Sequence, residues 1–194
     1  ASTNIQDAVD ACVAGGDVII GDGCFGLGGR TNAGYPTHVV LEKPVHVSSL
    51  NGPDATYIVE GNVYGWRGAS IDNGAVLEGV TISNCHADGS SFFGRIGGGV
   101  FMYGGLVSNC VIMHSVAKTG GGGIACYGGG VVAASTIDGN ICGSGNGGGI
   151  YLFGDAVVRR CHIRNNTSSD KGGGVYNYSA TVCTCLLHDN TAGN

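Results

Sequence analysis

Gly147-Gly148-Gly149-Ile150-Tyr151-Leu152-Phe153 decides the fold, because closely similar stretches recur along the chain at a fixed spacing. Gly triplets end at positions 99, 123, 149 and 174, which are 24, 26 and 25 residues apart, and a β-branched residue follows each one. Two further columns keep this period: Cys110, Ser135, Cys161 and Cys185, with Val80 one coil earlier; and Cys85, Ser115, Asn140, Asn166 and Asn190. Such a repeat is typical of a solenoid in which each period forms one coil.

The length of the repeat indicates β-structure. At about 3.3 Å per residue, one period can wrap three short strands around a narrow core. Successive coils would pair in parallel, so that equivalent residues stack in columns. The Cys/Ser column is predicted to face the core. Asn140, Asn166 and Asn190 are predicted to form a hydrogen-bonded Asn ladder in a turn.

The N-terminal part differs from the repeats and predicts a helical cap over residues 1–16. Thr3-Asn4-Ile5-Gln6 has the spacing of a capping box, and Gly15-Gly16 is expected to end the helix. Its apolar face would consist of Ile5, Ala8, Val9, Cys12 and Val13. Residues 17–79 are expected to form irregular first coils, with strands at 17–20, 38–41, 45–47 and 56–59 and a Gly-rich loop at 24–36. Residues 80–194 would form regular coils, all within one domain of residues 1–194.

These segments resemble a known group of proteins. Ile5-Gln6-Asp7-Ala8-Val9, Gly16-Asp17-Val18-Ile19-Ile20, Lys43-Pro44-Val45 and Asn51-Gly52-Pro53 are similar to the start of pectate-lyase-like β-helix proteins. The later coils resemble repeats of bacterial surface β-helices, including adhesins. The resemblance implies an all-β, single-stranded, right-handed parallel β-helix. It is unspecific for function, since that superfamily contains polysaccharide lyases, glycoside hydrolases, adhesins and inert stalks.

Composition excludes several classes. The chain has 194 residues, 39 of them Gly, yet the Gly residues lack the every-third-residue rule of collagen. A formal net charge of −5 argues against a nucleic-acid partner, and no apolar run is long enough to insert into a membrane. Nine cysteines without a C-x-x-C pair predict neither a metal site nor a cofactor. Cys12 and Cys24 are a candidate disulfide if the protein is secreted.

Candidate catalytic groups are sparse. Asp138, Asp155, Asp170 and Asp189 share no column, although paired carboxylates are what a glycoside hydrolase needs. A polysaccharide lyase needs a base beside a neutralising cation. The one basic cluster is Arg159, Arg160, His162 and Arg164, and it would lie on one side only if the strand continued unbroken. No catalytic residue is therefore assigned, and an enzyme of either type is the alternative function.

An aromatic panel is the strongest functional signal. Alternation after each Gly triplet predicts that the second and fourth residues point outward, and seven of these eight positions are aromatic: Phe101, Tyr103, Tyr127, Tyr151, Phe153, Tyr176 and Tyr178. Contiguous exposed apolar patches usually mark interaction surfaces. We therefore expect a non-catalytic, secreted or cell-surface scaffold of bacterial type. Its partner would be another copy of itself or a surface protein, with a polysaccharide as the alternative; the rings could also only stack on one another or lie beneath a loop.

Overall fold

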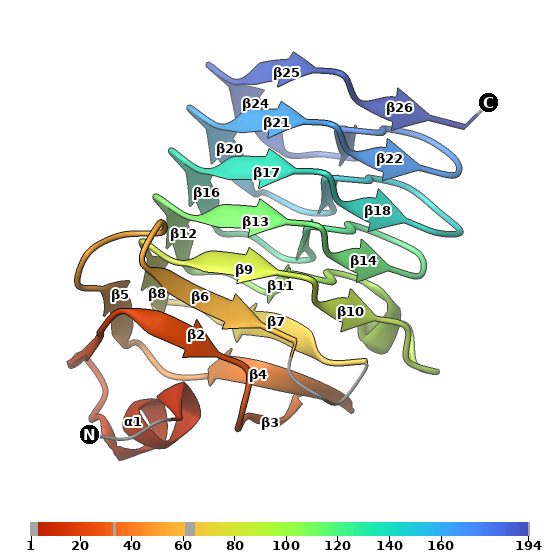
Figure 1. Ribbon diagram of the computed structural model, residues 1–194. Helices are drawn as coiled ribbons and strands as arrows, with labels where there is room; N and C mark the ends of the chain where they lie inside the picture. Colours follow the sequence, from red (N-terminus) through yellow and green to blue (C-terminus); the bar gives the residue numbers. More distant parts are fainter. Residues whose placement is uncertain (1–3, 33, 61–64, 194) are drawn as a thin grey trace.

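The computed structural model describes residues 4–32, 34–60 and 65–193 and shows a parallel β-solenoid of about 7 turns with ~26 residues per turn (Figure 1). Four sheets run along its length, each named here after its strand in one regular coil. The β12 sheet contains, in spatial order, β1 (Asp17–Ile20), β5 (His46–Ser49), β8 (Val76–Glu78), β12 (Leu106–Ser108), β16 (Val131–Ala133), β20 (Val157–Arg159) and β24 (Thr181–Cys183). The β13 sheet contains β2 (Gly23–Phe25), β6 (Thr56–Val59), β9 (Thr81–Ser83), β13 (Val111–Met113), β17 (Thr136–Asp138), β21 (His162–Arg164) and β25 (Leu186–His188).

The other two sheets complete each coil. The β14 sheet contains the two-residue strands β10 (His86–Ala87), β14 (Val116–Ala117), β18 (Ile141–Cys142), β22 (Thr167–Ser168) and β26 (Thr191–Ala192). The β15 sheet contains β3 (Arg30–Asn32), β4 (Tyr35–Leu41), β7 (Arg67–Ile71), β11 (Val100–Met102), β15 (Ile124–Cys126), β19 (Ile150–Leu152) and β23 (Val175–Asn177). A regular coil therefore has four short strands, where three were predicted, because short strands on both the β13 and β14 sheets are separated by a sharp corner.

Single residues form two of the corners. A left-handed residue joins the β12 and β13 sheets in four coils, and another joins the β13 and β14 sheets: Asn109, Ala134, Arg160 and Thr184 for the first corner, and Asn84, His114, Asn165 and Asp189 for the second. Non-Gly residues rarely adopt positive φ. Here the hydrogen-bonded strands on both sides of each corner hold the conformation.

The predicted core column is confirmed. Val100, Ile124, Ile150 and Val175 are paired in register along the β15 sheet, and the first three are fully buried. The predicted Asn ladder is also confirmed. Asn166 Oδ1 accepts a hydrogen bond from the Asn140 backbone N–H at 2.9 Å, and its Nδ2 donates to the Ile137 carbonyl at 2.9 Å.

The Gly triplets lie against this ladder. Gly121 begins its triplet with φ +61°, and a side chain on Gly122 would overlap the backbone carbonyls of Ile141 and Gly148 on the next coil. A Cβ on Gly123 would lie 2.9 Å from Asn140 Nδ2. Each triplet thus supplies a turn, a close approach between coils and space for an Asn side chain.

Helix α1 (Ile5–Ala11) covers the first coil but is shorter than predicted. Its N-cap is Asn4, whose Oδ1 accepts from the Gln6 backbone N–H at 2.9 Å; Thr3 lies outside the described residues. Val13 follows the helix and is 75% exposed, so it does not belong to the buried face. The buried Gln6 amide bonds both backbone groups of Val40 and ties the helix to β4.

The region predicted as a Gly-rich loop at 24–36 contains most of β2 and all of β3, so that prediction was wrong. β3 pairs antiparallel with β4, at the edge of an otherwise parallel sheet. The other first-coil strands were predicted near their observed positions. The same sheets continue from the first coils into the regular ones, with β5 and β12 on either side of β8.

Candidate functional site

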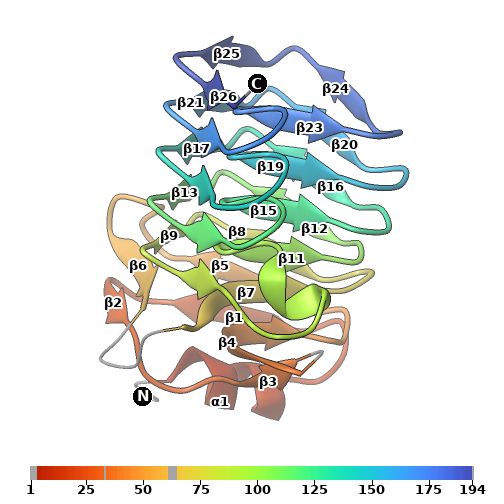
Figure 2. The same cartoon turned by 90° about the vertical axis from the view of Figure 1, so that its right-hand side faces the viewer.

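The predicted aromatic side chains project from the outer face of the β15 sheet. β11, β15, β19 and β23 lie one above another, with the 88–95 loop beside β11 (Figure 2). The middle residue of each strand forms one column, and the first residue after each strand forms the second. We call the following six residues the aromatic ladder: Tyr103, Tyr127, Tyr151, Phe153, Tyr176 and Tyr178.

The rings of the ladder stack on each other along the solenoid. Tyr127 and Phe153 have ring centroids 5.1 Å apart and an interplanar angle of 15°, and Phe153 and Tyr178 are 5.1 Å apart at 26°. In the other column, Tyr151 and Tyr176 are 5.5 Å apart at 11°. Since the faces of these rings are directed at their neighbours, the ladder presents mainly ring edges and hydroxyl groups to a partner.

Phe101 is a correction to the predicted surface. It points away from the solenoid core, but it is fully buried, because the 88–95 loop covers it. Phe93, in the 3₁₀ helix η1 (Phe93–Arg95) of this loop, has its ring 5.8 Å from that of Phe101 and makes an edge contact with Tyr127 at 5.2 Å. Phe101 therefore supports the ladder from beneath and is not available to a partner.

A buried arginine fixes the loop over Phe101. Arg67 donates hydrogen bonds to the backbone carbonyls of Gly97 at 3.0 Å, Ile96 at 2.9 Å and Phe93. Its guanidinium lies 5.1 Å from the Phe101 ring centroid. Burial lowers the pKa of Arg67 to about 10, so the group remains cationic at neutral pH. The cation–π contact and three carbonyl bonds compensate for the desolvation of this charge.

The exposed part of the ladder is a mixture of apolar edges and hydroxyls. Tyr178 is 69% exposed and Phe153 38%, while Tyr127, Tyr151 and Tyr176 are half-buried. None of the ladder's tyrosine hydroxyls is hydrogen-bonded to another described residue. Partial burial raises the pKa of Tyr151, so its hydroxyl stays protonated and can donate a hydrogen bond at neutral pH.

The basic cluster does not assemble as one face. The chain turns at Arg160, which has φ +56°, so the strand is broken between Arg159 and His162. Arg159 and Arg160 are exposed at this corner. Arg164 forms an ion pair with Asp138 at 2.9 Å, and His162 contacts His188 on the next coil. These residues do not build the base-and-cation arrangement of a lyase.

All nine cysteines are unbridged, including the candidate pair Cys12 and Cys24. Cys110 and Cys126 lie in the core, where burial raises the pKa of each thiol to about 12. Cys183 is exposed on the last coil. The interior thiols therefore act as small apolar side chains and not as nucleophiles.

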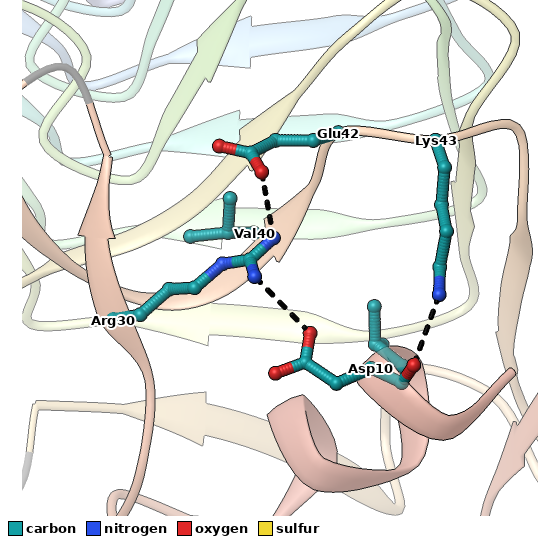
Figure 3. Close-up of a pocket in the computed structure, with 6 residues that line it drawn as sticks. Asp10, Arg30, Val40, Glu42 and Lys43 are labelled. Atoms are coloured by element: carbon teal, nitrogen blue, oxygen red, sulfur yellow. Dashed lines mark hydrogen bonds and ion pairs between the residues drawn. The ribbon is translucent and has the colours of Figure 1, made fainter.

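A pocket of about 460 Å³ lies between α1 and the β3–β4 hairpin (Figure 3). Arg30 reaches between Glu42, at 2.8 Å, and Asp10, at 3.4 Å. Lys43 Nζ donates to the Asp10 carbonyl at 3.1 Å and also to that of Cys12. These partners attach the cap to the hairpin, which accounts for the charges in this pocket.

Within residues 4–32, 34–60 and 65–193, no three His, Cys, Asp or Glu side chains converge as a metal site. Over the same residues, no helix is long and apolar enough to cross a membrane. Comparisons of the chain with protein-family models, curated proteins and solved structures found no match. The structure therefore establishes the solenoid architecture, and a function has to be argued from the site itself.

Sequence analysis missed the contribution of Phe92 and Phe93 to this surface. Both rings pack against Tyr127, at 5.5 Å and 5.2 Å between centroids. The signal that could have found them is the interval from Val80 to Cys110, which is 30 residues where other intervals are 24 to 26. The longer interval contains the loop that brings these two rings onto the next coil.

Proposed function

We propose that this protein is a non-catalytic, extracellular β-solenoid scaffold that associates with a second copy of itself through the aromatic ladder. The observation that carries this proposal is the pair of stacked ring columns, exposed along one face of a rigid sheet. Aromatic residues are enriched in protein interfaces because they bury large areas at a low cost in side-chain entropy. The resemblance to pectate-lyase-like and bacterial surface β-helices agrees with this role and with a secreted or cell-surface location.

The geometry favours a protein over a sugar as the occupant. A sugar ring stacks on an exposed aromatic face, whereas most faces in the ladder are directed at a neighbouring ring. A second ladder has the same spacing between rungs as the first, so two copies related by a two-fold axis can pack edge to edge along several coils. The unbonded tyrosine hydroxyls would then find partners across the interface.

Sedimentation velocity over a range of concentrations tests this proposal. The protein should self-associate, and a Phe153→Ser/Tyr178→Ser double variant should associate at least tenfold more weakly, which corresponds to about 1.4 kcal/mol. Ile141→Ser is the matched control, since Ile141 is 46% exposed on the β14 sheet, and it should behave like the unchanged protein.

Other outcomes would overturn the proposal. A strictly monomeric protein at the highest concentration would remove self-association as its role. Leu186 and Leu187 form a second exposed apolar patch, on the last coil. If Leu187→Ser abolished association while the ladder variant did not, the contact would lie at that coil. Glycan-array binding that is lost in the ladder variant would instead support a carbohydrate-binding module.

A further inference from the structure

Two histidine side chains on neighbouring coils point their Nε2 atoms at each other. His162 begins β21 and His188 ends β25, and the parallel register pairs His162 with Leu186 and Arg164 with His188. The two histidines are thus diagonal neighbours on the outer face of the β13 sheet. Their Nε2 atoms are 2.6 Å apart, and the ring centroids are 4.8 Å apart.

This contact requires a proton or a cation between the two rings. Each imidazole nitrogen carries either a hydrogen or a lone pair, so two protonated Nε2 atoms cannot face each other. Asp189 Oδ2 lies 2.7 Å from His188 Nδ1. This carboxylate favours a hydrogen on Nδ1 and leaves the Nε2 lone pair directed at His162. A carboxylate behind a histidine is the usual second shell of a metal-binding imidazole.

We propose that His162 and His188 bind a divalent transition-metal ion such as Zn²⁺ through their Nε2 atoms, with water as the remaining ligands. Zn–N bonds of about 2.0–2.1 Å, at angles between octahedral and tetrahedral, place two ligand nitrogens about 2.9–3.4 Å apart. The rings need to separate by only a few tenths of an ångström to reach this range. Both side chains are half-buried and accessible to solvent.

The surrounding charges allow a cation at this position. Arg164 is the neighbouring positive group on β21, and its guanidinium is neutralised by Asp138. Asp189 adds a negative charge beside His188. The site has two protein ligands, which is fewer than the three-residue clusters described above. It departs from the expectation of no metal and is independent of the proposed function.

Calorimetric titration with Zn²⁺ alone, in the presence of a reductant, tests the site. The protein should bind one Zn²⁺ tightly, and His162→Gln and His188→Gln should each weaken this binding at least tenfold, since even loss of a second-shell partner costs about 10–100-fold. Asp189→Asn should weaken it by about tenfold. His114→Gln is the matched control, because His114 is an exposed histidine on a different corner, and it should leave binding unchanged.

Hydrogen exchange gives a second readout. Because the metal would join β21 to β25, Zn²⁺ should slow amide exchange in β25 of the unchanged protein and not in His162→Gln. Tight binding that survives the His162→Gln/His188→Gln double variant would overturn the proposal. So would binding that disappears in Cys183→Ser, which would assign the ion to the exposed thiol.

Discussion

The first coils and the regular coils share the same four sheets but are stabilised in different ways. In the regular coils, one set of contacts repeats at each period, with a Gly triplet, an Asn or Ser side chain and the next coil in the same relation. The first coils use contacts that occur once each, such as Gln6 with Val40 and Arg67 with three backbone carbonyls. Periodic coils therefore depend on positions where only one residue type fits, and irregular coils depend on individual long side chains.

Gly122→Ala should have the largest effect on this comparison. The new methyl group would overlap two backbone carbonyls, of Ile141 and Gly148, which cannot move without separating the coils. We expect a loss of more than about 3 kcal/mol in the free energy of unfolding, measured by denaturant titration. Gly129→Ala is the matched control, because no atom lies within 4 Å of its added Cβ. Equal losses in the two variants would show that close approach of the coils is not the cause.

Asn166→Ala should cost about 2–4 kcal/mol, because it leaves the buried Asn140 N–H and Ile137 carbonyl without their partners. Asn166→Ser should cost less. Ser115 occupies the same column, and its Oγ accepts a hydrogen bond from the Cys85 N–H at 3.3 Å. Thermal unfolding of both variants checks this order, and a serine variant as unstable as the alanine variant would contradict it.

Arg67→Met should cost about 1–3 kcal/mol, since the loss of three hydrogen bonds is partly offset by removal of a buried charge. The effect should be local to residues 89–97, which Arg67 holds over Phe101. Hydrogen exchange should increase there and stay unchanged in β21 and β25. Uniformly faster exchange along the solenoid would show that the first coils support the regular ones more than their contacts indicate.

The parts of the fold that repeat could be predicted from sequence, and the parts that occur once could not. The columns at Val100 and Asn140 follow from a spacing that recurs four times, so each position is supported by the others. The buried position of Arg67 has no such support, because its partners lie in a loop about 30 residues away. The same reason explains Phe101, whose outward direction follows from strand alternation while its burial depends on the 88–95 loop. His188 was also missed, although its separation of 26 residues from His162 matches the repeat.

The claim that the aromatic ladder is the contact surface is tested most directly by NMR. Aromatic and methyl ¹H–¹³C spectra of the labelled protein would be recorded from dilute to concentrated solution. We predict that shifts change with concentration at Tyr103, Phe153 and Tyr178 and stay constant at the Leu27 and Ile141 methyl groups, which are exposed elsewhere. Spectra that do not change, or changes centred on Leu186 and Leu187, would contradict this account.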